Sequence, residues 1–323
     1  MPFAIRIHEH GGPEVLRWEE FDPGPPAAHE VRIRHTAIGV NFTDVYSRTG
    51  LYPGALPGGV GAEAAGVIEA IGRKVTGFRI GDRVMYMAAP PRAYCEVNTI
   101  AADRVLKIPR GIDDEIAAAG LLKGLTAQYL LRRTYRVKAG DTLLVTAAAG
   151  GMGLILGQWA SHLGARAIGI TSTQAKARLA RRHGYDKVLI GIEDMAARVR
   201  KLTRGEGVDV VYDSVGKDTF FESLDSLRLM GMMVSYGNAS GVAPAVSPGE
   251  LQKRGSLFLT RPTGIHYFSR REWLVQGARE FFKLVQQGTI RVEVKQRYRL
   301  ADAAQAHRDL EARRTVGSSV LIP

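Results

Sequence analysis

The chain has 323 residues, of which 45% are apolar and 24% are charged, and its 44 Lys and Arg against 32 Asp and Glu give a formal net charge of +12. This composition excludes an intrinsically disordered chain, and the length is enough for two domains of ~100–200 residues, each with its own core. The single cysteine, Cys95, excludes an intrachain disulfide scaffold and a cysteine-rich zinc site, and it favours a reducing, cytoplasmic location.

Residues 1–122 have the pattern of short strands separated by glycine and proline turns. Many short strands at this spacing predict a small, partly closed β barrel. A helix is expected to follow, with Asp113 or Asp114 as its N-cap. The predicted strands cover residues 3–7, 31–34, 65–71 and 83–86.

From residue 123 to residue 262 the pattern changes to alternating strands and helices. The strands are continuous apolar runs, and each is followed by a helical segment, which predicts a parallel doubly wound α/β sheet. One charge-free run, 142–165, is long enough to span a bilayer, but its glycines and polar residues favour a strand, a glycine turn and a buried helix, and no membrane association is expected. The predicted strands cover residues 142–146, 166–171, 188–190, 209–212 and 231–236.

The C-terminal segment, 263–323, adds an amphipathic helix at 273–286, an alternating strand at 290–294, another helix and a terminal strand at 319–322. Alternation indicates a strand with one solvated face, which is typical of the N-terminal region and not of the central sheet. We therefore expect residues 263–323 to return to the first domain, which leaves 123–262 as the second.

A glycine-rich turn follows the first strand of the central sheet. Aligned on the dinucleotide fingerprint G-x-G-x-x-G, its three small positions are Ala148, Gly150 and Gly153. Together with Gly151 and Met152, they would present helix N-terminal N–H groups to a pyrophosphate. The apolar strand before the turn and the apolar helix after it are the context that the motif requires, so we expect a bound dinucleotide.

The end of the next strand indicates which nucleotide is bound. Enzymes that use NAD place an acid about 20 residues after the fingerprint, to hold the ribose 2′-hydroxyl. The corresponding stretch, 171–176, has no acid and contains Ser172 and Lys176, which suit a 2′-phosphate. The sequence therefore favours NADPH over NADH.

Two motifs of the first domain, GAEAAG at 61–66 and GVNFTD at 39–44, resemble signatures of the medium-chain dehydrogenase/reductase superfamily. Its zinc alcohol dehydrogenases have a histidine ligand where this chain has Ala62 and a cysteine ligand where it has Asn41. An alanine methyl group and a neutral amide are not competent zinc donors. We therefore expect no metal and hydride chemistry without a Lewis acid, which argues against alcohol oxidation.

The resemblance is closest to the zinc-free NADPH:quinone oxidoreductases, the group that contains zeta-crystallin, and it runs nearly end to end. It implies a GroES-like substrate domain (1–122 and 263–323), a Rossmann dinucleotide-binding domain (123–262) and a substrate cleft between them. It also implies homodimers that join the Rossmann sheets near 232–236 and 257–260. The motifs that carry it are 41–46, 50–53, 122–129, 147–153, 211–216, 235–238, 260–262 and 317–322.

The same resemblance implies the site. Asn41, Tyr46, Tyr52 and Thr126 would line the cleft, and Asn41 and Thr126 would also contact the cofactor. Further cofactor contacts are implied at Tyr236, Gly237 and Asn238, and contacts to the 2′-phosphate at Ser172, Lys176 and Arg313. One position departs from the group's pattern, since Gly191 stands where a tyrosine is frequent.

The expected reaction is hydride transfer from NADPH to a quinone. Asn41 and a tyrosine hydroxyl would donate hydrogen bonds to the carbonyl oxygen that gains charge, and Tyr52 is the better candidate for delivering the proton. Asp44 and Glu63 are expected to be structural acids.

Two alternatives remain open. The first is an NADPH-dependent reductase of conjugated alkenals or enones, because it needs the same cofactor geometry. The second is a non-catalytic member of the group that binds RNA through its basic surface. A solvated helix face explains basic clusters such as 178–183 better than nucleic acid does.

Overall fold

The computed structural model describes residues 1–87 and 90–323. By its internal contacts the chain divides into two compact units. Unit 1 comprises Met1–Lys123 and Val292–Pro323, and unit 2 comprises Gly124–Arg291. The helix α2 (Asp114–Tyr129) runs across the division.

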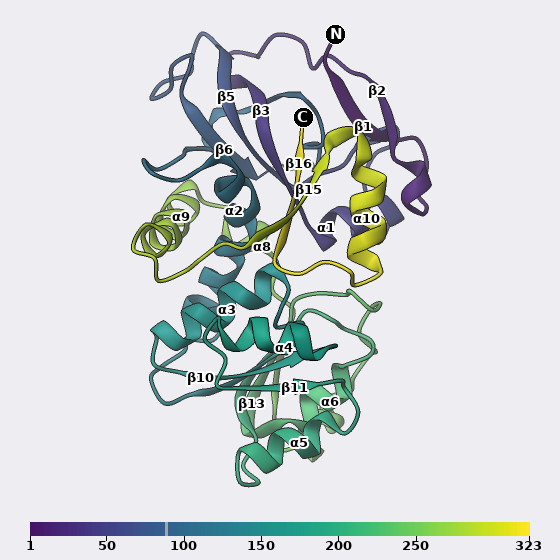
Figure 1. Ribbon diagram of the computed structural model, residues 1–323, viewed down its shortest axis with the longest axis vertical. Coiled ribbons are helices and arrows are strands. Elements are labelled where there is room, and N and C mark those ends of the chain that lie inside the picture. The colour runs from purple at the N-terminus through teal and green to yellow at the C-terminus, as the bar shows by residue number, and fades with distance from the viewer. Residues whose placement is uncertain (88–89) are drawn as a thin grey trace. The chain divides into compact units, whose positions relative to one another are not determined.

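Unit 1 is built on a seven-stranded sheet in the order β15-β16-β3-β5-β6-β8, with β7 also paired to β3 (Figure 1). The long strand β3 alternates between buried apolar residues such as Val31 and Ile33 and outward-facing arginines. A second sheet has the order β2-β1-β4. The strands are β1 (Phe3–Ile7), β2 (Arg17–Glu20), β3 (Glu30–Val40), β4 (Gly58–Gly59), β5 (Glu63–Ile71), β6 (Arg83–Met87), β7 (Val97–Ala101), β8 (Val105–Lys107), β15 (Val294–Arg299) and β16 (Ser318–Ile322).

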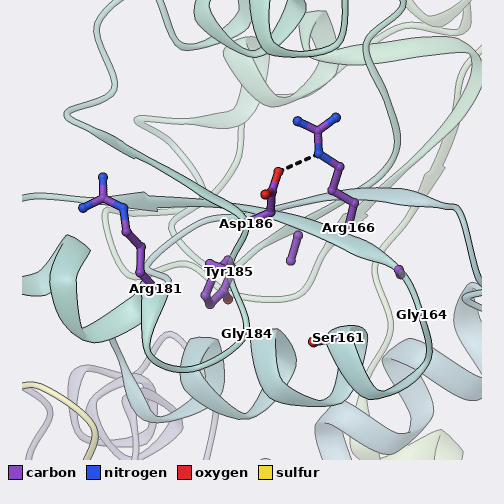
Figure 2. Close-up of a pocket in the computed structure, with 9 residues that line it drawn as sticks. Ser161, Gly164, Arg166, Arg181, Gly184, Tyr185 and Asp186 are labelled. Carbon is purple, nitrogen blue, oxygen red and sulfur yellow. Dashed lines mark hydrogen bonds and ion pairs between the residues drawn. The ribbon is translucent and has the colours of Figure 1, made fainter.

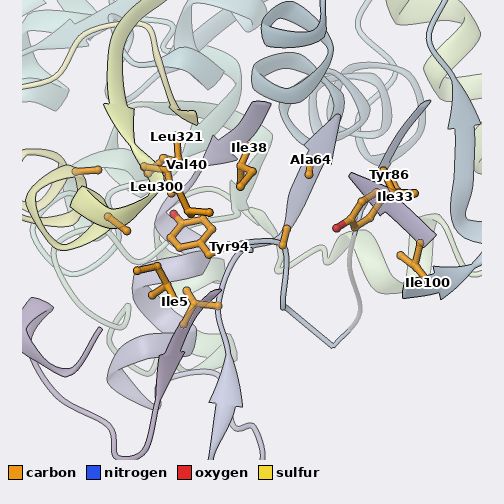
Figure 3. Close-up of a cluster of buried hydrophobic side chains, with 14 of the residues drawn as sticks. Ile5, Ile33, Ile38, Val40, Ala64, Tyr86, Tyr94, Ile100, Leu300 and Leu321 are labelled. Atoms are coloured by element: carbon orange, nitrogen blue, oxygen red, sulfur yellow. The ribbon is translucent and has the colours of Figure 1, made fainter. Parts of the chain in front are cut away.

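The core of unit 1 lies between these sheets and α10 (Ala303–Glu311). Figure 3 shows side chains from distant parts of the sequence in one cluster, among them Ile5, Ile38, Tyr94 and Leu321. Each is at most 2% exposed. Burial of one such side chain stabilises the fold by about 1.5–3 kcal/mol, so this cluster fixes the ends of β3 and β5, from which the site residues of unit 1 follow.

The C-terminal strands return to unit 1, as predicted. In Figure 1, β16 lies beside β3, and their pairing is antiparallel, with Val320 opposite Gly39. The prediction of a strand at 290–294 is wrong, because β15 begins only at Val294. Ile290 and Val292 are buried in irregular backbone instead, so their alternation reflects packing outside a sheet.

The division between the units also differs from the predicted one, since residues up to 291 pack with unit 2 and the expected boundary was 262. The cause is α9 (Arg271–Gln286), which buries one apolar face that includes Phe281 and Phe282. The Phe281 ring lies 2.3 Å from where a Cβ on Gly124 would be, and its centroid is 6.1 Å from that of Trp159. An amphipathic pattern shows that a helix has a partner but does not show which one.

Unit 2 is a six-stranded parallel sheet in the order β11-β10-β9-β12-β13-β14, which confirms the predicted doubly wound architecture. The chain moves outward from β9 to β11 and then returns to place β12 on the other side of β9. This reversal is a topological switch point, where α/β proteins bind ligands. The strands are β9 (Thr142–Val145), β10 (Arg166–Thr171), β11 (Lys187–Ile190), β12 (Val208–Asp213), β13 (Leu227–Ser235) and β14 (Phe258–Thr260).

The helices α3, α4 and α6 of unit 2 pack on this sheet, and two glycines allow the approach of α3 to β10. A Cβ on Gly157 or on Gly169 would lie 2.3 or 2.9 Å from the ring of Tyr185, whose hydroxyl donates to the Gly153 carbonyl over 2.6 Å. No helix in the part of the chain that the structure describes has the length and apolar character of a membrane span. The helices are α3 (Gly151–His162), α4 (Gln174–Arg181), α5 (Met195–Leu202), α6 (Phe220–Asp225), α7 (Pro248–Lys253), α8 (Gly264–Tyr267) and α9.

Candidate functional site

The glycine turn connects β9 to α3 at the switch point. Gly150 is the N-cap of α3, and a Cβ there would have only the Ala147 carbonyl oxygen near it, at 3.4 Å. At Gly153 a Cβ would lie 2.5 Å from that oxygen and 2.7 Å from Ala148. Gly153 therefore permits close packing of the helix on the turn, whereas Gly150 leaves the space in front of the first N–H groups open. The residues present fit a bound pyrophosphate.

The next strand ends beside this turn, because β10 pairs in parallel with β9. After Thr171, the exposed Ser172 leads to Thr173, which caps α4 by accepting a hydrogen bond from the Lys176 N–H over 3.2 Å. Ser172 thus lies in the loop before α4, and Lys176 lies in the first turn of this helix. At the end of β11, Gly191 has a φ of 76°, a conformation that disfavours other residues, tyrosine included.

On the other side of the switch point, Asp213 at the end of β12 organises the backbone. Its buried carboxylate accepts hydrogen bonds from side chains and backbone N–H groups on both sides of the loop that follows. The donors are Thr146 Oγ1, Val215 N, Gly216 N, Thr219 Oγ1 and Ser223 Oγ, at 2.6–3.2 Å. This loop supports the next one, since a Cβ on Gly216 would lie 3.2 Å from the Asn238 Cα.

The turn Tyr236–Asn238 follows β13 at the same edge of the sheet. Arg261 braces it, with Nη1 donating to the Ser235 carbonyl over 2.8 Å. In the amide orientation that satisfies both of its polar atoms, Asn238 accepts from Arg261 Nη2 at 3.1 Å and donates to the Gly237 carbonyl. The structure therefore brings three predicted loops to one edge of the sheet in unit 2.

In unit 1, Asn41 lies between the end of β3 and the start of α1 (Phe42–Thr49), and its side chain is part of a buried polar network. Asn41 Nδ2 donates to Glu63 Oε1 over 2.9 Å, and Lys123 Nζ donates to Asn41 Oδ1 over 2.7 Å. Lys123 Nζ also lies 3.3 Å from Glu63 Oε1, and the Leu122 N–H donates to Glu63 Oε2 over 2.6 Å. A charged pair therefore holds the amide from both sides.

The two predicted tyrosines of unit 1 lie together. Their ring centroids are 5.2 Å apart in an edge-on arrangement, and the Tyr52 N–H donates to the Tyr46 carbonyl over 3.0 Å. Tyr46 is 7% exposed on α1, whereas Tyr52 is 40% exposed on the loop after it. The more exposed tyrosine is thus the one predicted to deliver the proton.

A second buried network leads away from Asp44, on the first turn of α1. Tyr94 Oη donates to Asp44 Oδ2 over 3.0 Å and lies 3.2 Å from His307 Nε2. Arg48 Nη1 contacts His307 Nδ1 at 3.1 Å, and a guanidinium can only donate, so the neutral imidazole carries its proton on Nε2. Arg48 also forms a two-pronged ion pair with Glu311.

Two predicted residues remain, Arg313 and Thr126. Arg313 is exposed after α10 in unit 1, with a φ of 58°. Thr126 is half-buried in α2, on the part of that helix that belongs to unit 2. The predicted set is therefore divided between the two units.

The donor set around Asn41 does not fit a zinc ion. Ala62 offers no ligand atom, and the Glu63 carboxylate and the Asn41 oxygen already accept hydrogen bonds from the Lys123 ammonium. A divalent cation would have to displace that positive charge. Over residues 1–87 and 90–323, no group of three or more His, Cys, Asp and Glu side chains is arranged to hold a metal.

A shallow pocket in unit 2 lies away from these loops (Figure 2). It is at the amino end of β10, where Arg166 pairs with Asp186 over 2.7 Å, and so at the sheet edge opposite to the glycine turn. Tyr185, Arg181 and Ser161 also line it, but none of the predicted site residues does.

Sequence reasoning missed two residues of the site, Lys123 and Asp213, as functional positions. For Lys123 a signal was present, because it is the one charged residue in the otherwise uncharged run 116–131. A lone charge in a buried helix needs a partner. For Asp213 the signal was its place at the end of an apolar strand.

Comparisons with known proteins agree with this architecture. The alcohol dehydrogenase GroES-like domain family matches residues 27–141, and the zinc-binding dehydrogenase family matches residues 151–274. The chain is 50% identical to the quinone oxidoreductase of Pseudomonas aeruginosa and 47% identical to a 2-haloacrylate reductase of Burkholderia; both alignments cover 100% of this chain, and 100% and 99% of the relatives. The crystal structure of Escherichia coli quinone oxidoreductase complexed with NADPH superposes with a TM-score of 0.97 at 47% identity, covering 99% of this chain and 100% of that one.

A GroES-like unit and a Rossmann unit with a glycine turn at its switch point define a medium-chain dehydrogenase or reductase. This confirms the predicted fold class. Within that superfamily the chain belongs to the quinone oxidoreductase family, as the sequence motifs predicted.

Proposed function

We propose that this protein is an NADPH-dependent quinone reductase. The observation that carries the proposal is the full-length likeness, at 47% identity and a TM-score of 0.97, to a quinone oxidoreductase solved with NADPH. The glycine turn and the acid-free loop after β10 in this chain suit the same cofactor. A quinone accepts a hydride and a proton to become a hydroquinone, and NADPH becomes NADP⁺.

The cofactor contacts follow from the loops of unit 2. Backbone N–H groups of the Ala148–Gly153 turn would hold the pyrophosphate, and Ser172 and Lys176 the 2′-phosphate, because a hydroxyl and an ammonium both donate to phosphate oxygens. Further contacts are proposed from Thr126, the Tyr236–Asn238 turn and Arg313. When bound, NADPH supplies a hydride from C4 of its nicotinamide ring.

The residues of unit 1 act on the acceptor. The second N–H of the Asn41 amide, the one that does not donate to Glu63, would donate to the carbonyl oxygen that gains negative charge. Tyr52, on its exposed loop, would donate the proton that completes the hydroquinone, and Tyr46 would support the Tyr52 ring at 5.2 Å. Since the donor set beside Asn41 does not fit zinc, these hydrogen bonds replace a Lewis acid in the proposal.

A titration and a rate measurement test the proposal together. NADPH should bind more tightly than NADH, and Lys176→Ala should weaken NADPH binding ~10-fold while leaving NADH binding within a factor of about two. Lys187→Ala, at the amino end of β11, is the matched control. Equal affinity for both nucleotides that Lys176→Ala does not change would refute the 2′-phosphate contact. No NADPH oxidation with any quinone would refute the activity.

A second candidate is reduction of a conjugated double bond, and one observation favours it: the 47% identity to a 2-haloacrylate reductase. Both reactions need the same hydride donor, and they differ in whether an oxygen or a carbon receives the proton. Steady-state rates with 1,4-benzoquinone and with an α,β-unsaturated aldehyde distinguish the two. Turnover of the aldehyde alone would replace the quinone proposal.

We further propose a homodimer formed through β14. This strand ends the sheet of unit 2, so it presents unpaired backbone groups on one side, and Phe258 is 57% exposed on it. Leu229 and Met230 nearby are 68% and 62% exposed. Sedimentation should give a dimer mass that Phe258→Glu converts to a monomer; a monomer for the unaltered chain would contradict the proposal.

A cytoplasmic location, argued from the single cysteine, is testable by cell fractionation.

A further inference from the structure

We propose that Lys123 is a positioning residue that, with Glu63, holds the Asn41 amide in one orientation, so that Asn41 can act toward a bound carbonyl only as a hydrogen-bond donor. This inference deepens the proposed function and rests on it for its chemical consequence. The geometry on which it stands lies wholly within unit 1.

The amide has four hydrogen-bonding positions, and the network uses one acceptor position and one donor position. The oxygen accepts from the Lys123 ammonium at 2.7 Å, and one N–H donates to the Glu63 carboxylate at 2.9 Å. A flipped amide would point its oxygen at the carboxylate and its NH₂ at the ammonium, and both contacts would be repulsive. Opposite charges on its two sides therefore fix the amide, and its second N–H remains for a ligand.

Lys123 is fixed in the same way. Its side chain is 9% exposed, and its three N–H groups have three acceptors: the Val40 carbonyl at 3.4 Å, Asn41 Oδ1 at 2.7 Å and Glu63 Oε1 at 3.3 Å. An ammonium buried with all its donors used has little freedom to move. The backbone supports this arrangement, since α2 supplies both Lys123 and the Leu122 N–H to the same carboxylate.

A glycine near the end of β3 leaves space for this network. A Cβ on Gly39 would lie 2.4 Å from Glu63 Oε1 and 2.3 Å from the Ala118 carbonyl oxygen. Gly39 therefore allows both the carboxylate and α2 to approach the end of β3. This close packing leaves the buried charged pair little freedom to move.

The network also places a positive charge beside residue 41, where zinc enzymes of the superfamily have a metal ligand. The ammonium polarises the amide through its oxygen, which strengthens the opposite N–H as a donor. Glu63 balances the charge, so the trio as a whole is neutral. In a hydride transfer the acceptor oxygen gains negative charge, and a fixed, polarised donor stabilises that charge more than it stabilises the neutral ground state.

The first experiment needs no substrate. In ¹H–¹⁵N spectra the Asn41 side chain, assigned by the loss of its signals in Asn41→Ala, should give two well separated NH₂ protons. The proton that donates to Glu63 should exchange slowly with solvent. The neutral pair Glu63→Gln/Lys123→Met should bring these signals together and speed exchange. Rapid exchange in the unaltered protein would overturn the inference even if quinone reduction is confirmed.

The second experiment measures the chemical consequence and separates it from stability. Lys123→Met alone leaves the buried Glu63 carboxylate without its counter-charge, so the melting temperature should fall. The neutral pair removes both charges, and its melting temperature should return toward that of the unaltered protein. The kcat of the neutral pair with benzoquinone should nevertheless stay at least ~10-fold below that of the unaltered protein. This loss is smaller than the ~10²–10³-fold loss expected for removal of a direct donor. The Kd for NADPH should change less than about threefold.

Two outcomes would overturn the inference here. The first is a neutral pair that recovers kcat together with stability, since Lys123 would then only balance Glu63. The second concerns a cycle with Asn41→Ala. Added to Asn41→Ala, the neutral pair should lower kcat little further, whereas losses that multiply would show that Lys123 does not act through Asn41. Lys107→Met, which removes an exposed lysine paired with Asp82 over 2.8 Å, is the control.

Discussion

Asp44 is a fully buried acid with an incomplete set of partners. Its Oδ2 accepts from the Asn41 N–H at 2.8 Å and from the Tyr94 hydroxyl at 3.0 Å, and its Oδ1 has no hydrogen-bond partner within the described part of the chain. Burial raises the pKa of Asp44 to about 7, and the nearby Glu63 charge adds to the shift, which Lys123 partly opposes. Near neutral pH this carboxyl is therefore partly protonated in the folded protein.

Asp44→Asn should change how stability depends on pH. The folded pKa is about 7 and the model-compound value is 3.8, so between these values the folded state binds more protons than the unfolded state, and the Asp44 contribution to stability falls as pH rises. An asparagine does not titrate and can still accept one of the two hydrogen bonds. The melting temperature of the variant, relative to the unaltered protein, should therefore rise from pH 4 to pH 7. A constant difference would show that Asp44 is ionised throughout.

Tyr52→Phe tests the proposed proton donor. Removal of a general acid typically lowers the rate ~10²–10⁴-fold, and because quinones are strongly electrophilic we expect a loss at the lower end, about 10²-fold in kcat. Tyr46→Phe removes the hydroxyl of the neighbouring ring, which is 7% exposed, and should cost less than about fivefold. Stopped-flow oxidation of NADPH measures both. If Tyr52→Phe keeps full kcat, the proton comes from water or from another group.

At the scale of elements, two glycines of one turn have different roles. Gly153 has no room for a Cβ, which would lie 2.5 Å from the Ala147 carbonyl oxygen, whereas Gly150 would place its Cβ 3.4 Å away. Gly153→Ala should therefore lower the free energy of unfolding by about 1–3 kcal/mol. Gly150→Ala should leave stability nearly unchanged but weaken NADPH binding, because the methyl group would enter the space in front of the helix N–H groups.

Urea unfolding and NADPH titration on both variants separate these roles. Each variant is the control of the other, since both add one methyl group to the same turn. A large stability loss in Gly150→Ala, or unweakened NADPH binding by it, would contradict the assignment of that glycine to the pyrophosphate.

The elements that the sequence predicted well are those whose pattern has one physical cause. The strand before the glycine turn was predicted at 142–146 and found at Thr142–Val145, because an apolar run between polar turns fits only a buried strand. β3 is longer than predicted, at Glu30–Val40, since its second half is buried on both faces and loses its alternation. The strand expected at 290–294 failed for the opposite reason, because its alternation came from packing outside a sheet.

The site was predictable where chemistry is local. The turn Ala148–Gly153 and the acid-free loop with Ser172 are read from adjacent residues. The partnership of Asn41, Glu63 and Lys123 is not, because it joins residues 82 positions apart in the sequence and depends on which face α2 presents to β3. A single sequence shows the lone lysine but not its partners.

At the scale of the whole molecule, unit 1 contains buried titratable groups whose contributions to stability change in opposite directions with pH. Burial lowers the pKa of His35 to about 4, and burial together with the Arg48 charge lowers the pKa of His307 to about 3, both from 6.5. Between pH 6.5 and these values the unfolded state binds more protons, so acidification removes stability. Asp44 acts in the opposite direction, but the two histidine shifts together exceed its shift. Unit 1 should therefore lose stability as pH falls below 6.5.

His307→Gln should reduce this acid sensitivity. A glutamine can accept from Arg48 through its oxygen and donate to Tyr94 through its amide nitrogen, as the neutral imidazole does, but it does not take up a proton. Urea midpoints of the unaltered protein should fall between pH 6.5 and pH 4.5, and those of the variant should fall less. His29→Gln, at an exposed position of unit 1, should follow the unaltered protein. If the urea midpoint of His307→Gln falls as much as that of the unaltered protein, the acid sensitivity arises elsewhere. His35 is then the next buried group to substitute.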